Sequence, residues 1–311
     1  MDCIRKLTEL RRNVESVLLG KPEVVRQVLT ALLARGHVLL EDVPGVGKTV
    51  LTRAVARSID CKFSRIQLTP DLLPSDILGV SVYDSRTGEF QFKPGPIFAH
   101  IVLVDEINRT TPRTQSALLE AMNESQVTAD GKTYPLGPPF MVLATQNPYE
   151  FEGTYFLPEN QLDRFILRVR IGYPDKEVER DILRTQPALT RLGKLQPVMG
   201  IEDVIELQER VMSVRFDEAI MDYVLAIAEA TRRSNDLTMG LSPRGSLALM
   251  QAARAAALID GRDYVIPDNV KDLAVAVCAH RLQTKAFVHD GSAGDTEAIF
   301  RHILETIPAP Q

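Results

Sequence analysis

The sequence predicts an α/β fold in which a three-layer αβα domain with a parallel five-stranded sheet is followed by a small all-α domain. Three observations support this prediction. Apolar strands alternate with helical segments from about residue 10 to residue 185, as in parallel sheets covered by helices. A glycine-rich loop lies between the first strand and the next helix. Beyond about residue 200, every periodic segment is helical.

The strands of the sheet are expected where apolar runs are short and end at turn or polar residues. Five such runs occur, at residues 37–41, 63–68, 101–105, 140–145 and 166–171. A helix at 176–185 follows the last of them. This order of strands and helices predicts one doubly covered sheet rather than separate hairpins.

The second domain is recognised from the ends of its helices. Gly261 follows an alanine-rich helix at 244–260 as a stop signal, and Pro267 opens another helix. We therefore expect three parts, namely an αβα domain at residues 1–186, a linker at 187–199 and an all-helical domain at 200–311.

The composition is that of an ordinary globular protein, with 311 residues of which 45% are hydrophobic and 25% charged. No apolar run reaches the roughly 18 residues of a membrane span, and the N-terminus lacks the pattern of a signal peptide. We expect a cytoplasmic protein without a membrane segment. A net charge of −5 counts against a protein that mainly binds nucleic acid, although a local basic pore is compatible with it.

The three cysteines do not suggest a structural or metal-binding role. Cys3, Cys61 and Cys278 lie far apart, with no paired spacing to each other or to the five histidines. Neither a disulfide framework nor a zinc site is supported. We expect incidental thiols.

Residues Asp42 to Thr49 form a phosphate-binding loop, Asp-Val-Pro-Gly-Val-Gly-Lys-Thr. Gly45 and Gly47 allow close approach of the backbone to phosphates, Lys48 supplies a cation, and the Thr49 hydroxyl can hold Mg²⁺. The full pattern has glycine where this chain has Asp42, but the preceding strand and following helix supply the required context. The expected loop contacts are Val43, Pro44, Gly45, Val46, Gly47, Lys48, Thr49 and Val50.

Two carboxylates follow the strand at 101–104, at the edge of the sheet where ligands bind. Asp105 suits a magnesium ion that triphosphate also holds, usually through water. Glu106 suits the orientation or deprotonation of an attacking water molecule. The alternative is a solvated acidic strand end.

Three further polar residues are candidates for the same chemistry. Asn147 follows another strand and could bind the attacking water or the terminal phosphate, although Asn-Pro is also a common turn. Arg244 lies in the first turn of a helix, where the dipole disfavours a cation unless a phosphate is near. A solvated arginine is the alternative. Arg164 precedes the fifth strand, from which it could reach a nucleotide in its own or a neighbouring subunit.

Together these segments resemble an AAA+ ATPase of the MoxR family. The resemblance rests on the phosphate loop and on four more motifs in order: Leu-Val-Asp-Glu-Ile-Asn-Arg (103–109), Ala-Thr-Gln-Asn-Pro (144–148), Leu-Asp-Arg-Phe (162–165) and Leu-Ser-Pro-Arg (241–244). It spans nearly the whole chain. An aspartate at the position of Asp42 is a variation that this group tolerates.

The resemblance implies a P-loop nucleoside triphosphatase with ATP and Mg²⁺ as cofactors. Lys48 and Thr49 resemble the Walker A pair, and Asp105 and Glu106 the Walker B pair. Asn147 resembles the sensor 1 residue. Val17 to Gly20 resembles the segment that packs near adenine, which makes Gly20 a candidate contact.

The resemblance also implies an oligomer. Arg244 resembles the sensor 2 arginine of the lid domain, acting as the two domains close. Arg164 resembles the arginine finger that enters the site of the adjacent subunit, and Arg109 is a further candidate at that interface. A finger that acts in trans makes oligomerisation part of the mechanism. A homo-oligomeric ring of six is implied.

Two insertions are similar to those of one clade of the family. The segment 68–100 resembles a pore-directed insert, in which Tyr83, Arg86 and Phe90 are candidates for partner contact. The segment 127–134 has β-forming residues around an Asp-Gly turn, which predicts a hairpin. A surface hairpin without a partner is the alternative for each.

The function implied is ATP hydrolysis coupled to remodelling or maturation of a protein client, often one with a von Willebrand factor A domain. Three alternatives stay open: a metal-chelatase motor subunit, a DNA-acting ring, and a nucleotide-binding scaffold that does not hydrolyse. The acidic balance counts against the second, and intact Lys48, Asp105 and Glu106 count against the third.

Overall fold

The computed structural model describes residues 2–148, 155, 157–285 and 293–310. Its central sheet has five parallel strands in the order β2-β5-β8-β1-β9. They are β1 (His37–Glu41), β2 (Phe63–Gln67), β5 (Ile101–Asp105), β8 (Met141–Gln146) and β9 (Phe165–Val169). The predicted five-stranded parallel sheet is confirmed, and its strands lie within two residues of the predicted bounds.

Helices cover both faces of this sheet, because alternate strand residues point to opposite sides. Val38 and Leu40 belong to one apolar cluster and Leu39 to the other. The first cluster includes helices α1 (Asp2–Glu15), α2 (Pro22–Leu33) and α3 (Lys48–Ile59). The second includes α5 (Pro112–Glu124). The predicted three-layer arrangement is therefore confirmed.

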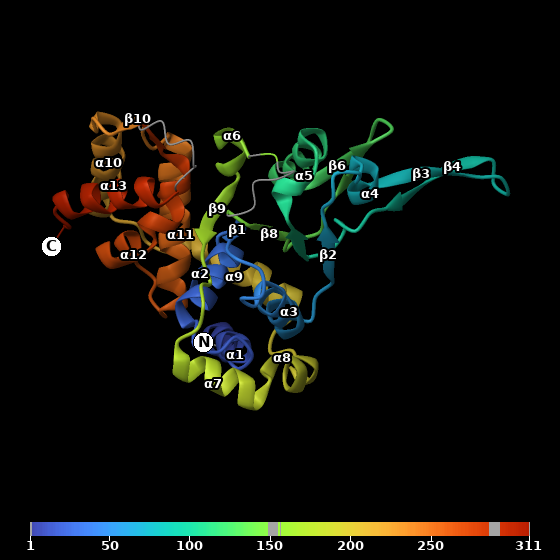
Figure 1. Cartoon of the computed structure of the whole chain (residues 1–311), viewed down its shortest axis with the longest axis horizontal. Helices are drawn as coiled ribbons and strands as arrows, with labels where there is room; N and C mark the ends of the chain where they lie inside the picture. The colour runs from blue at the N-terminus through green and yellow to red at the C-terminus, as the bar shows by residue number, and fades with distance from the viewer. Residues whose placement is uncertain (1, 149–154, 156, 286–292, 311) are drawn as a thin grey trace.

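Two antiparallel hairpins interrupt the αβα layers. The insertion at 68–100 contains α4 (Pro74–Leu78) and the hairpin of β3 (Gly79–Asp84) and β4 (Glu89–Pro94), which projects away from the body of the molecule (Figure 1). The second hairpin, β6 (Gln126–Ala129) and β7 (Lys132–Pro135), turns at Asp130-Gly131 as predicted, with both residues at positive φ.

The segments around the last strand are short and helical. The 3-10 helix η1 (Ile107–Arg109) follows β5, and α6 (Glu159–Leu162) precedes β9. After β9 come α7 (Lys176–Thr185), α8 (Pro187–Thr190) and the 3-10 helix η2 (Leu192–Lys194). The expected linker at 187–199 thus carries two short helices.

The second domain consists mainly of helices, as predicted. They are α9 (Ile201–Ser213), α10 (Glu218–Arg233), α11 (Pro243–Ile259), α12 (Pro267–Cys278), the 3-10 helix η3 (Ala279–Arg281) and α13 (Ala293–Thr306). The sequence did not predict two short antiparallel strands, β10 (Leu237–Met239) and β11 (Gln283–Thr284). Each strand is only two or three residues long and connects helices, so its sequence pattern cannot be distinguished from that of a loop.

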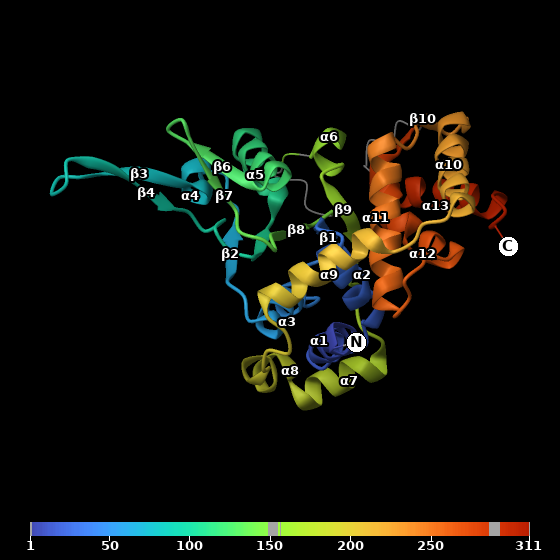
Figure 2. The same cartoon turned by 180° about the vertical axis from the view of Figure 1, so that it is seen from behind.

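The helical domain packs directly on α1 and α2. The Gln208 side chain donates to the Leu32 carbonyl at 2.7 Å, and Lys6 pairs with Asp203 at 2.8 Å. One apolar cluster extends through both regions without a break at residue 200. Figures 1 and 2 show the helical domain on one side of the sheet and the β3–β4 hairpin on the other. Among the described residues, none of the helices has the length and apolar content needed to cross a membrane.

Candidate active site

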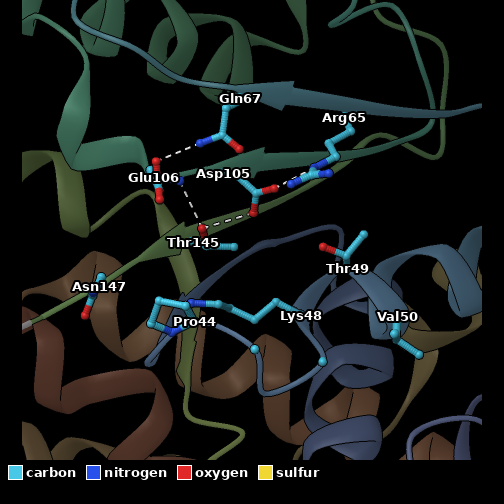
Figure 3. A pocket seen from close by; sticks show the side chains of 12 residues that line it. Pro44, Lys48, Thr49, Val50, Arg65, Gln67, Asp105, Glu106, Thr145 and Asn147 are labelled. Atoms are coloured by element: carbon cyan, nitrogen blue, oxygen red, sulfur yellow. Dashed lines mark hydrogen bonds and ion pairs between the residues drawn. The ribbon is translucent and has the colours of Figure 1, made fainter. Parts of the chain in front are cut away.

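A hollow of about 350 Å³ opens at the carboxyl ends of β1, β2, β5 and β8. We call it the phosphate hollow (Figure 3). It brings together most of the predicted site residues, which come from segments far apart in the sequence. Its lining consists of Pro44, Gly45, Gly47, Lys48, Thr49, Val50, Arg65, Gln67, Asp105, Glu106, Thr145 and Asn147.

The loop at the base of the hollow needs its two glycines. Gly45 has φ +87° and Gly47 φ +103°, which side chains rarely adopt, and a Cβ on Gly47 would lie 2.9 Å from Leu18. Helix α3 begins at Lys48, so its positive end faces the hollow. The Lys48 ammonium donates to the Asp42 carbonyl at 2.7 Å. Burial lowers the pKa of Lys48, and the carboxylates around the hollow oppose this shift.

Strand β2 supplies two side chains that hold the carboxylates and that sequence reasoning missed. Arg65 donates to Asp105 at 2.7 Å, and Gln67 donates to Glu106 at 2.7 Å. Arg109 also lies near Glu106, with Nε 3.6 Å from its carboxylate. Arg65 and Gln67 alternate with Ile66 along β2, so the sequence indicates that the two polar side chains share one face of the strand. It does not indicate which strand lies next to β2, and so it could not predict their contacts with Asp105 and Glu106.

Thr145 is a third residue that sequence reasoning missed. Its hydroxyl donates to Asp105 at 3.2 Å and accepts the backbone N–H of Glu106 at 3.0 Å. Glu106 has φ 61° and ψ 55°, a left-handed conformation that is costly for a residue with a side chain. Thr145 therefore helps to fix the backbone of Glu106 at the hollow, which Asn147 also lines (Figure 3).

The donor set of the hollow fits a magnesium ion that shares its ligands with phosphate. Thr49 and Asp105 offer a hydroxyl and a buried carboxylate, which are the hard oxygen donors that Mg²⁺ prefers. Within the described part of the chain, no group of three or more His, Cys, Asp or Glu side chains could hold a metal alone. Phosphate oxygens and water would have to complete the coordination.

A second hollow, of about 340 Å³, lies beside the loop and is mainly apolar. We call it the apolar hollow. It is lined by Val17, Leu18, Leu19, Lys21, Gly45, Val46, Gly47, Val50, Gly172, Pro174, Ile182, Leu183, Gln186, Pro187, Ala188 and Leu189. Helix α7 thus provides one wall, with Ile182 and Leu183. The size and lining suit a nucleobase.

Two predicted contacts line neither hollow. Gly20 lies under α7, where an added Cβ would be 2.7 Å from Val178, so its lack of a side chain serves helix packing. Val43 is half-buried and is also outside both linings. Both remain predictions as contacts of a bound nucleotide.

The structure does not bring Arg164 and Arg244 to the phosphate hollow. Both line a third hollow of about 290 Å³ at the amino ends of β1 and β9, which we call the arginine hollow. Arg244 donates to Asn123 at 2.8 Å and lies 3.5 Å from Asp163. The buried Nη1 of Arg164 has no hydrogen-bond partner. The expected closure of Arg244 over its own nucleotide is not seen in this conformation.

Comparison with known proteins agrees with this geometry. A model of the "ATPase family associated with various cellular activities (AAA)" matches residues 37–167, and an AAA lid domain model matches residues 229–303. The chain is 51% identical over 301 residues to Uncharacterized protein YeaC of Bacillus subtilis, covering 96% of this chain and 93% of that protein. It is 41% identical over 314 residues to Chaperone MoxR1 of Mycobacterium tuberculosis, covering 96% and 81% respectively. The chain belongs to the MoxR family of AAA+ ATPases.

A solved structure confirms the AAA+ fold over nearly the whole chain. The crystal structure of a candidate ATPase from Cytophaga hutchinsonii superposes with a TM-score of 0.89 at 36% identity, and covers 99% of this chain and 96% of that one. The family assignment from sequence motifs is therefore confirmed. The phosphate loop of this MoxR family member lies between β1 and α3, within the residues that the AAA model matches.

Proposed function

We propose that this MoxR family protein hydrolyses ATP with Mg²⁺ at the interfaces of a homo-oligomeric ring and uses the energy to remodel a protein client. One observation carries the proposal. A single hollow combines Lys48 and Thr49 of the loop with the carboxylates of Asp105 and Glu106. The adjoining apolar hollow gives room for the base.

Each residue has a distinct task in this reaction. The loop N–H groups and Lys48 bind and orient the phosphates, while Thr49 and, through water, Asp105 hold Mg²⁺. The metal neutralises charge on the phosphate oxygens when bound. Glu106 orients the attacking water or accepts its proton, and Asn147 positions the same water or the terminal phosphate. The bonds of Gln67 and Thr145 hold the Glu106 segment ready for this task.

Arg164 and Arg244 are proposed to serve the site of the neighbouring subunit. They lie at the amino ends of the strands, whereas the phosphate hollow lies at the carboxyl ends. The five residues of β1 span roughly 16 Å, which exceeds the reach of an arginine side chain. The Nη1 of Arg164 is buried and lacks a hydrogen-bond partner in this conformation, so this role requires the side chain to move when a neighbour's phosphate supplies the acceptor. A ring of six follows from family resemblance.

The β3–β4 hairpin is the proposed contact with the client. Tyr83 is 55% exposed and Phe90 71% exposed, and their rings lie 5.4 Å apart near the tip of the hairpin. Exposed aromatic side chains on a projecting element are common anchors for protein partners. A client with a von Willebrand factor A domain is proposed from family resemblance.

The direct test uses Glu106→Gln. This variant keeps the size and hydrogen-bonding ability of the side chain but removes the base. We expect normal ATP binding, hydrolysis at least about 100-fold slower, and recovery of a protein client with the tagged variant in the presence of ATP. Undiminished hydrolysis would remove Glu106 from its proposed role, and recovery of DNA instead of protein would contradict the proposed client class.

A further inference from the structure

Asp42 stands where the phosphate-loop pattern has glycine, and the backbone does not require glycine there. The described residues with positive φ include Gly45 and Gly47 of the loop but not Asp42. A side chain is thus accommodated without strain at this point of the loop. Asp42 is also buried, with 9% of its surface exposed, so its carboxylate needs hydrogen-bond partners.

The carboxylate of Asp42 has two backbone partners. One oxygen accepts the N–H of Val43 at 2.9 Å, which stays within the loop. The other accepts the N–H of Gly172 at 2.6 Å, 130 residues further along the chain. Asp42 therefore joins the start of the phosphate loop to the segment after β9.

The segment joined to Asp42 forms part of the apolar hollow. Gly172 and Pro174 line that hollow, and α7 begins at Lys176. Gly172 has φ +64°, which allows the chain to turn its N–H toward Asp42. Lys21 adds a bond to the Tyr173 carbonyl at 2.8 Å, but this bond comes from outside the phosphate loop.

We propose that Asp42 is a positioning residue that holds one wall of the apolar hollow, the segment from Gly172 into α7, at a fixed distance from the phosphate loop. The inference rests on the proposed nucleotide function and adds a role for the residue that departs from the loop pattern. A ligand that spans both hollows binds more tightly when this distance is fixed, because the protein loses less conformational freedom on binding. A ligand confined to the phosphates gains little.

The charge of Asp42 offers a different explanation, because this carboxylate also acts on the Lys48 ammonium. Two substitutions separate the explanations. Asp42→Gly restores the usual loop residue and removes both the charge and the bond to Gly172. Asp42→Asn removes the charge and one of the two acceptor oxygens, but keeps an oxygen that can accept the Gly172 N–H in place of the Val43 N–H.

The test compares ADP, which spans both hollows, with inorganic pyrophosphate, which fills only the phosphate hollow, by titration calorimetry of the full chain. In Asp42→Gly we expect Kd for ADP to rise roughly tenfold, and Kd for pyrophosphate to change less than about twofold. In Asp42→Asn, Kd for ADP should stay within about threefold of the wild-type value.

Hydrogen exchange gives a second measurement that does not depend on ligand. The Gly172 amide should be protected in the wild type and in Asp42→Asn, and should exchange faster in Asp42→Gly. Three results in Asp42→Gly would overturn the inference: an equal rise in Kd for ADP and pyrophosphate, an unchanged Kd for ADP, or unchanged exchange of the Gly172 amide. If Kd for pyrophosphate changes in both Asp42→Gly and Asp42→Asn, the lost charge of Asp42, and not the lost bond to Gly172, explains the change in binding. A wild-type protein that binds neither ligand would overturn the proposed function and this inference together.

Discussion

Single residues of the sheet hold the site through contacts between neighbouring strands. The Glu106 carboxylate accepts from Gln67 of β2, while Thr145 of β8 accepts the Glu106 N–H. The sequence pattern predicted Asp105 and Glu106 because they follow an apolar strand. It could not predict Arg65, Gln67 or Thr145 as their partners, since strand order within a sheet is set by packing between distant segments.

His37, the first residue of β1, gives a prediction about pH at the residue scale. It is buried and neutral: its Nε2 donates to the Met122 carbonyl and its Nδ1 accepts the Val142 N–H, each at 3.0 Å. Burial lowers the pKa of His37 to about 4, whereas the unfolded chain keeps a value near 6.5. Between these values the unfolded state binds more protons, so the free energy of unfolding falls as pH falls.

The expected loss from His37 is roughly 3 kcal/mol between about pH 6.5 and pH 4, and it can be followed by urea unfolding at a series of pH values. Because burial also lowers the pKa of His280, His37→Gln should reduce the slope of stability against pH rather than abolish it. His302→Gln, on the exposed side of α13, is the matched control substitution. An unchanged slope in His37→Gln would contradict the assigned neutral state.

At the scale of elements, the two hairpins show which features can be predicted from local sequence and which cannot. The Asp130-Gly131 turn predicted the β6–β7 hairpin, because turn chemistry is local. The β3–β4 hairpin could be placed only as an insertion, since its turn has no two-residue signal. Its link to the other hairpin was not predictable, because the stacking of Phe92 on Tyr134 at 4.0 Å joins residues of separate segments.

The aromatic pair of the β3–β4 hairpin provides the prediction at this scale. Tyr83→Ser with Phe90→Ser should abolish capture of the client by the Glu106→Gln trap, because an exposed apolar contact is lost. ATP hydrolysis without client should stay within about twofold of wild type, since surface changes seldom alter stability by more than about 0.5 kcal/mol.

The matched control changes the other face of the same hairpin. Val80 and Val82 are 49% and 37% exposed and alternate with Tyr83 on strand β3. Val80→Ser with Val82→Ser should keep client capture. Equal loss of capture in both double variants would show that the aromatic face has no special role.

At the scale of the whole molecule, the motifs predicted the family, the sheet and the helical second domain. They did not predict where the two arginines lie, because that depends on how the helical domain packs against α2 and β9. Packing gathers Arg164 and Arg244 in the arginine hollow, beside Asp163, Asn123 and Arg281. If both arginines serve a neighbouring subunit as proposed, the site on one chain is incomplete and hydrolysis requires the ring.

The most direct measurement mixes two inactive variants. Lys48→Ala loses the phosphate cation but keeps Arg164, whereas Arg164→Ala keeps the phosphate hollow but loses the finger. If Arg164 acts on the neighbouring subunit, mixed rings contain complete interfaces wherever an Arg164→Ala site meets a Lys48→Ala neighbour. We predict ATP hydrolysis well above the sum of the separate variants, approaching about one quarter of wild type at equal amounts if each complete interface turns over independently. Activity no greater than that sum, in mixtures shown to assemble together, would contradict a site shared between subunits.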